Sequence, residues 1–185
     1  MLNARFCSLV AIVLAAAAAR LLPHPPNFTP IGAMALFGGV YFARKEVAFA
    51  VPLAAMFLSD LALGVIQYGH AIWRPMPFVY IGFFVTVLLG RIIHSNPRPA
   101  RIIAATLGGS VLFYVISNFG VWVGGSLYPR TLDGMITCYV AAIPFFRNML
   151  AANVFYTAVL FGGFAFAERF FRVLREQPVL VKSES

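Results

Sequence analysis

The chain has 185 residues, of which 61% are hydrophobic and only 11% charged, whereas soluble domains are about 45–50% apolar and about 25% charged. This composition excludes an ordinary soluble domain, and the net charge of +8 indicates membrane orientation rather than a nucleic-acid surface. We expect one compact membrane domain over residues 1–168, without an attached soluble catalytic domain, and a basic cytoplasmic tail over residues 169–185.

Apolar runs along the chain predict an all-α integral membrane protein. A helix needs roughly 20 apolar residues to cross a hydrocarbon core of about 30 Å. Six segments predict about six transmembrane helices in one bundle: 6–22, 31–42, 47–67, 77–93, 102–125 and 141–167. The second holds only twelve residues, too few to span unless neighbouring helices bury it or it begins in the preceding loop. Five or six spans are therefore expected.

The cationic residues predict the orientation of these spans. With six spans and both termini cytoplasmic, four cationic residues face outward, Arg20, Arg74, Arg130 and Arg147, and ten face inward. This distribution agrees with the positive-inside rule. The inward-facing residues are Arg5, Arg44, Lys45, Arg91, Arg98, Arg101, Arg169, Arg172, Arg175 and Lys182.

The N-terminal segment has two interpretations. Arg5 followed by an apolar stretch and several alanines is similar to a cleavable secretory signal. In the other interpretation, Ala11, Ala15 and Ala19 are spaced by four residues and form a small-residue stripe. Such a stripe allows close packing of another helix, which belongs either to a partner or to the chain's own bundle.

Asp60 is the only carboxylate well inside an apolar run. Charged groups within membrane spans are costly, which makes each of them a candidate functional residue. Asp60 must be protonated, paired with a cation such as Arg147, or exposed to an aqueous cavity. A structural ion pair and a ligand contact both remain open.

The segment between the first two spans is rich in proline. Four prolines within residues 23–30 fix φ and predict a stiff, extended loop on the outer side. His24 and Asn27 offer polar groups and Phe28 a stacking face, so the loop suits a lid over a polar ligand. A rigid connector is the alternative.

A second set of candidate ligand residues lies near the outer ends of the later spans. It consists of Trp73, Asn118, Trp122, Tyr128, Arg147, Asn148 and Asn153. Together with the loop, this set predicts an outward-opening cavity with aromatic walls and few polar anchors, the usual makeup of a small-molecule site. Alternatively, the aromatic residues form a belt at the membrane interface, and the polar residues form a structural network. Gly120 and Gly124 also predict a close contact between helices.

Enzyme motifs are largely absent from the sequence. The histidines, His24, His70 and His94, fall in or beside loops, and Asp60 has no second carboxylate near it. We therefore expect no enzyme, no cofactor and no metal site. Cys138 is a candidate reactive thiol or soft metal ligand, although a lone buried cysteine is usually inert.

Several separate strings carry a family resemblance: PHPPNFTPIGAMALFGG, LSDLALG, SNFGVW, YPRTLDG and CYVAAIPFFRN. Over residues 22–163 they resemble a bacterial family of small membrane proteins catalogued as transport proteins with a domain of unknown function. That family in turn resembles the substrate-binding S components of energy-coupling factor (ECF) vitamin transporters. The shared features are about 180 residues, six helices, a covering loop after the first helix and an S-D-x-x-L-G-like segment on the third.

The resemblance implies a protein of the bacterial inner membrane that captures a vitamin-like micronutrient at the outer face. Ala11, Ala15 and Ala19 match the stripe that docks on an ECF coupling subunit, which separate ATPases drive; a solitary protein is also compatible. Some solitary members are linked to cobalamin, and one type uses a cysteine thiolate, for which Cys138 is the candidate here. A membrane structural or assembly protein that acts through helix–helix contacts with a partner is the alternative function.

Overall fold

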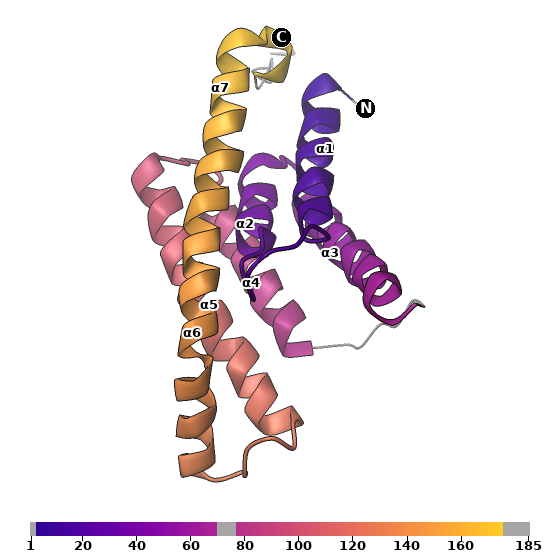
Figure 1. Ribbon diagram of the computed structural model, residues 1–185. Helices are drawn as coiled ribbons and strands as arrows, with labels where there is room; N and C mark the ends of the chain where they lie inside the picture. The colour runs from indigo at the N-terminus through magenta and orange to yellow at the C-terminus, as the bar shows by residue number, and fades with distance from the viewer. Residues whose placement is uncertain (1–2, 70–76, 176–185) are drawn as a thin grey trace.

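The structure, a computed structural model, describes residues 3–69 and 77–175, and every regular element in these ranges is helical (Figure 1). The elements are α1 (Ala4–Ala19), α2 (Ile31–Tyr41), α3 (Lys45–Tyr68), α4 (Pro77–Ile93), α5 (Pro99–Gly124), α6 (Leu132–Thr157), α7 (Gly163–Phe170) and a short 3₁₀ turn (Arg172–Leu174). A π-helical turn at Ala158–Gly162 joins α6 to α7, so Leu132–Phe170 is one long helix. The all-α prediction is confirmed.

Three of these helices are long and apolar enough to cross a membrane: Lys45–Ile66, Pro99–Gly124 and Leu132–Phe170. The other apolar helices, α1, α2 and α4, are shorter. This composition of the helices indicates a membrane protein, as the sequence predicts. The two ends of the described chain lie at one end of the bundle, and the turn between α5 and α6 lies at the other (Figure 1).

The last long helix begins at Leu132, so the expected start at residue 141 was wrong. The Thr131 side chain accepts a hydrogen bond from the Gly134 amide at 3.1 Å and caps the helix. Asp133 lies in the first turn, where a carboxylate is stabilised by the helix dipole. Asp133 therefore belongs to the first turn of the helix and does not mark a loop before it.

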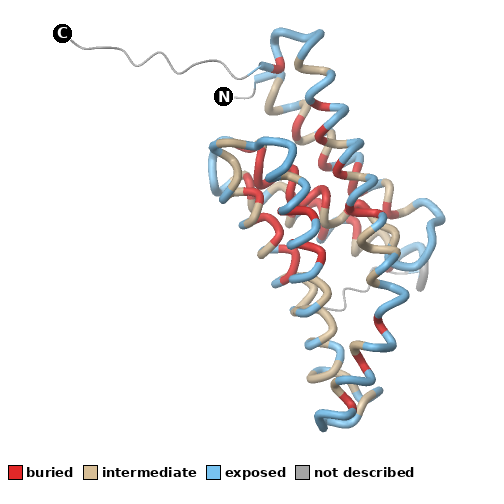
Figure 2. Tube along the Cα trace, turned by 90° about the vertical axis from the view of Figure 1, so that its left-hand side faces the viewer, coloured by how far each residue is buried: buried red, intermediate tan, exposed pale blue. Residues whose placement is uncertain are grey.

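Helix α2 is the central element of the bundle. All residues from 33 to 40 are buried, and α2 contacts α1, α3, α4, α5 and α6. Figure 2 shows the buried segments gathered in the middle of the molecule, while the far end of the α5–α6 hairpin is mostly exposed or intermediate. The neighbouring helices thus provide the burial that so short an apolar segment requires.

Glycines allow α2 to approach its neighbours at backbone distance. A Cβ at Gly39 would lie 2.3 Å from the Val87 carbonyl oxygen and 2.9 Å from the Gly90 Cα, both on α4. On α2's other side, a Cβ at Gly38 would lie 2.3 Å from Cγ of Pro52, which is inside α3. Since real Cβ contacts are not this short, the crossing of α2 and α4 requires glycine.

Helix α1 packs with Val13 and Ala16 in the core and presents Ala11 and Ala15 to the outside, while Ala19 is half-buried. Two of the three residues of the small-residue stripe, Ala11 and Ala15, therefore face away from the chain's own bundle.

Arg5 ties α1 to the end of the last helix. Its guanidinium forms an ion pair with Glu168 and donates a hydrogen bond to the Leu174 carbonyl. The guanidinium carbon also lies 5.3 Å from the centroid of the Phe164 ring. The first residues of the predicted basic tail are thus folded against α1, and residues 176–185 lie outside the described residues.

Replacing Gly39 by alanine should destabilise the protein by about 1–3 kcal/mol, because the new methyl group must push α2 away from α4. Gly108 is the matched control, since a Cβ there meets nothing within 4 Å. Gly108→Ala should stabilise by about 0.5–1 kcal/mol through backbone entropy. Thermal unfolding in detergent measures both variants, and equal melting temperatures would contradict the close contact.

Candidate functional site

A cavity of about 490 Å³ opens between the proline-rich loop, the start of α2, and helices α4, α5 and α6. This volume is typical of small-molecule sites, which measure about 300–1,000 Å³. The lining residues are Asn27, Thr29, Ile31, Gly32, Val79, Thr86, Gly109, Phe113, Tyr114, Ser117, Asn118, Val121, Leu127, Tyr128, Cys138, Ala141, Ala142, Phe145, Phe146, Met149 and Asn153.

The lining is apolar and aromatic, with neutral polar groups. Phe113, Tyr114, Phe145 and Phe146 contribute rings, and the centroids of Tyr114 and Phe146 lie 4.7 Å apart. None of the described residues in the lining carries a formal charge. The cavity is therefore suited to a neutral, largely apolar molecule, because an unpaired ionic group is costly in such surroundings.

Asn153, which lines the cavity, belongs to a buried polar chain that joins α5 and α6. Asn153, only 4% exposed, donates from Nδ2 to Ser110 Oγ at 2.9 Å, and Ser110 Oγ donates to the Thr106 carbonyl at 2.7 Å. The Asn153 Oδ1 atom is buried and has no hydrogen-bond partner among the described residues. Gly32 lies against this amide, since a Cβ there would be 2.5 Å from Oδ1.

The proline-rich loop covers part of the cavity and is held at several points. Asn27 has a φ of 61°, a left-handed conformation that asparagine tolerates, and it lines the cavity. Asn148 on α6 donates from Nδ2 to the Pro26 carbonyl at 3.0 Å. The Phe28 ring packs against Tyr156, with 5.9 Å between centroids. The loop is therefore fixed to the bundle by both polar and aromatic contacts.

The α5–α6 hairpin supplies the opposite wall. Asn118 donates from Nδ2 to the Tyr114 carbonyl at 2.8 Å, and the Cys138 thiol lies 3.7 Å from the Asn118 carbonyl oxygen. The Trp122 indole donates to the Pro129 carbonyl at 3.0 Å, which fixes the turn that carries Tyr128. These contacts position Asn118, Cys138 and Tyr128 along the cavity.

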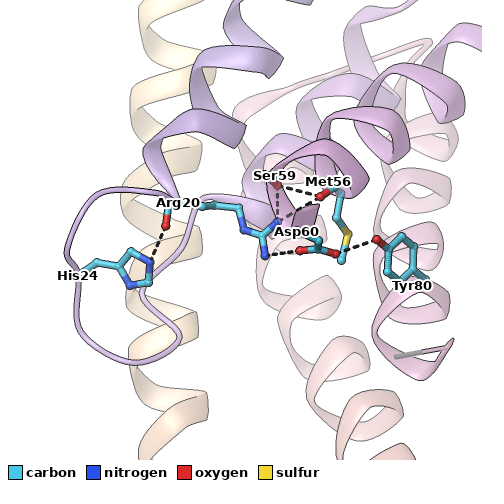
Figure 3. Close-up of polar contacts among 6 residues, drawn as sticks. All are labelled: Arg20, His24, Met56, Ser59, Asp60 and Tyr80. Carbon is cyan, nitrogen blue, oxygen red and sulfur yellow. Dashed lines mark hydrogen bonds and ion pairs between the residues drawn. The ribbon is translucent and has the colours of Figure 1, made fainter. Parts of the chain in front are cut away.

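A separate polar cluster joins the end of α1 to α3 and α4 (Figure 3). Arg20 is 9% exposed and forms an ion pair with Asp60, with 2.8 Å between Nη2 and Oδ1; its Nη1 also donates to Ser59 Oγ. Tyr80 donates to the second carboxylate oxygen of Asp60 at 2.7 Å. A ring nitrogen of His24 lies 3.2 Å from the Arg20 carbonyl oxygen, so the cluster also reaches the loop.

The structure thus places only some of the candidate ligand residues at the cavity. Of the eleven, four line the cavity: Asn27, Asn118, Tyr128 and Asn153. Trp73 lies outside the described residues. The other six lie outside the lining: His24, Phe28 and Asn148 hold the loop, Asp60 belongs to the Arg20 cluster, Trp122 fixes the hairpin turn, and Arg147 is exposed.

Asp60 pairs with Arg20, so the suggested pairing with Arg147 was wrong. Arg147 lies on the outer face of α6, beside a smaller groove with Pro144, Asn148 and Ala151. The predicted close helix contact at Gly120 and Gly124 is found only in part. Gly120 lies against the Phe78 ring of α4, whereas a Cβ at Gly124 would meet nothing within 4 Å.

Most of the aromatic and hydroxyl residues of the cavity were missed by reasoning from the sequence. They include Thr86, Phe113, Tyr114 and Ser117. The usable signal is spacing: the lining positions 109, 113, 117 and 121 on α5, and 138, 142, 145, 149 and 153 on α6, recur at intervals of three or four residues and so share a helix face. Within the described ranges, no cluster of three His, Cys, Asp or Glu residues is arranged to hold a metal ion.

Comparison with known proteins identifies a family whose function is unknown. The model of a family of unknown function (DUF6580) matches residues 1–177, which include every residue of the cavity lining and of the Arg20 cluster. No curated protein and no solved structure matches the chain.

Replacing Asp60 by asparagine should destabilise the protein by about 1–3 kcal/mol, because it leaves the Arg20 guanidinium buried without its counter-charge. A double variant, Arg20→Leu with Asp60→Leu, should lose less stability than the sum of the two single replacements. Thermal unfolding in detergent measures Asp60→Asn, the two single leucine variants and the double variant.

The control is Glu46→Gln, which removes an exposed ion pair with Arg44 and should leave the melting temperature unchanged. Equal effects of Asp60→Asn and Glu46→Gln would contradict a structural role of the Arg20–Asp60 pair.

Proposed function

The chain belongs to a family of unknown function (DUF6580), and we propose that it is a membrane-embedded binding and uptake protein for a small, vitamin-like organic micronutrient, similar to the S components of ECF transporters. The observation that carries this proposal is the cavity of about 490 Å³ beneath the proline-rich loop, with aromatic walls and neutral polar groups. Its volume and lining are those of a small-molecule site. No catalytic role follows from this lining, so the proposal is binding and not an enzyme activity.

The proposed topology has six crossings, with both termini in the cytoplasm of a bacterial inner membrane. The arrangement of the helices supports this topology, because the described termini lie together at one end of the bundle and the α5–α6 turn lies at the other end (Figure 1). The junctions on the side of the termini are basic: Arg44 precedes α3 and Lys45 begins it, and Arg98 and Arg101 lie at the start of α5. This is the distribution that the positive-inside rule requires of cytoplasmic segments.

The exposed alanines on α1 support a helical partner. Ala11 and Ala15 face away from the bundle, where small side chains allow another helix to approach closely. In the lead proposal this partner is an ECF coupling subunit driven by separate ATPases; a solitary protein would leave the face to lipid. The same observation favours the second candidate function, a membrane assembly protein that acts through helix contacts with a partner and holds no solute.

Ligand binding should appear as a thermal shift of the detergent-purified protein in a panel of cobalamin, thiamin, riboflavin, biotin, folate and pyridoxine. A ligand at 100 times its Kd adds about 2.7 kcal/mol of stability, which is readily measured. Cys138 lies in the cavity wall and is 2% exposed, so a cobalamin shift that disappears in Cys138→Ser would assign a thiolate contact to cobalt.

Ala142→Phe should abolish the shift, because the larger side chain fills the cavity that Ala142 lines. Ala151→Phe is the matched control on the same helix, since Ala151 is exposed and lies outside the cavity lining. A shift that survives Ala142→Phe would place the ligand elsewhere. A flat panel together with a stably copurifying membrane partner would favour the assembly function.

The orientation can be tested with single cysteines in a background of Cys7→Ser and Cys138→Ser. Arg130→Cys, in the α5–α6 turn, should react with a membrane-impermeant maleimide in intact cells, whereas Arg44→Cys, between α2 and α3, should react only after permeabilisation. Both positions are exposed, so burial does not explain a difference between them. Labelling of both sites in intact cells would contradict the six-crossing topology.

A further inference from the structure

The end of the cavity near Gly32 holds a hydrogen-bond acceptor that nothing in the described chain satisfies. Ser110 has a single hydroxyl proton, and it is donated to the Thr106 carbonyl at 2.7 Å. Ser110 Oγ must therefore accept from Asn153, which fixes the Asn153 NH₂ group toward Ser110. The orientation of the amide follows: Oδ1 is the atom left buried and unpartnered, against Gly32 at the cavity wall.

Unpaired donors lie next to this acceptor. The first turn of α2 begins at Ile31, and its cap residue, Pro30, forms no side-chain cap hydrogen bond. Ile31 and Gly32 both line the cavity. Their amides belong to the first turn, whose N–H groups have no partner within a helix, and no hydrogen bond among the described residues satisfies them. The same wall therefore offers a fixed acceptor beside N–H donors and the positive end of a helix dipole.

We propose that the ligand of this cavity carries a neutral amide-type group, an amide, lactam or imide, bound between Asn153 and the first turn of α2. The ligand N–H donates to Asn153 Oδ1, and its carbonyl accepts from the amides of Ile31 and Gly32. This inference rests on the proposed binding function and adds the chemical class of the ligand.

A carboxylate fits this position less well than an amide. It has no proton to donate, so one of its oxygens would face the lone pairs of Asn153 Oδ1. No cation lines the described part of the cavity to offset its charge. The helix dipole of α2 alone supplies only a partial charge. Specificity for the amide over the acid then comes from a repulsive contact as well as an attractive one.

The aromatic wall indicates what the rest of the ligand contains. The rings of Phe113, Tyr114, Phe145 and Phe146 line the space beyond the polar end. Such rings favour planar or apolar groups that stack against them or meet their edges. A ring-bearing compound with an amide-type edge satisfies both parts of the cavity.

The direct test compares acids that lack an amide-type group with their amides: nicotinate with nicotinamide, and lipoate with lipoamide. Binding to the full-length protein in detergent is measured by thermal shift and then by calorimetry. In any pair that binds, the amide should bind at least about tenfold more tightly than the acid, and N,N-dimethylation of the amide should cost about tenfold or more.

Variants of Asn153 and Gly32 test whether the preference for the amide comes from the proposed contacts. In Asn153→Leu, dimethylation of the bound amide should no longer change the affinity, because the acceptor is gone. Gly32→Ala should weaken the amide at least about tenfold, since the new methyl group displaces the Asn153 side chain. Arg147→Gln, exposed on the same helix as Asn153 and outside the cavity, should bind as the unmodified protein does. Melting temperatures without ligand report whether each variant folds.

The outcomes separate this inference from the function on which it rests. Equal or tighter binding of an acid overturns the inference and leaves the binding function standing. Binding of pyridoxine or thiamin alone does the same, because neither carries an amide-type group. An equal effect of dimethylation in the unmodified protein and in Asn153→Leu also overturns it, without relying on the variant's stability. If no amide, acid or panel compound binds, the binding function fails and the inference fails with it.

Discussion

The shortness of α2 is the constraint on which the rest of the structure depends. Eleven residues rise only about 16 Å as a helix, about half of a hydrocarbon core of about 30 Å. Such a segment cannot face lipid at its ends, so it must be enclosed by other helices. The glycines at its crossing with α4 make this enclosure possible, because they bring the two backbones into contact. The space that α2 does not fill, beyond Ile31, is the cavity.

The Arg20 cluster holds the start of the proline-rich loop in place. The loop connects the end of α1 at Ala19 with the start of α2 at Ile31, so its first residue must be fixed to the bundle. Arg20 provides this attachment by reaching across to Asp60 on α3, which Tyr80 on α4 also binds. Asp60 is therefore explained by the packing of three helices, and its position outside the cavity lining agrees with a structural role.

The sequence predicted the helices better than the faces of the helices. The range 77–93 matches α4, and 31–42 differs from α2 by one residue, because proline, glycine and charge mark their ends. The all-α class and the apolar helices also follow from composition. The partner of Asp60 and the aromatic wall do not, because α5 and α6 are apolar all round and offer no polar face to set their rotation. The few polar residues stand out in such helices, which is why Asn118, Arg147 and Asn153 were identified and Phe113 was not.

The proline-rich loop gives the cavity a wall that exists before any ligand arrives. Its prolines restrict the backbone, Asn27 adopts the left-handed conformation that the turn requires, and Asn148 and Phe28 hold it to the last long helix. Ordering a flexible loop on binding would cost conformational entropy and lower the affinity. Because the chain has already ordered this loop, and because the Ser110 contact holds the Asn153 amide in one orientation, a ligand that matches the polar end of the cavity gains its hydrogen bonds without that cost.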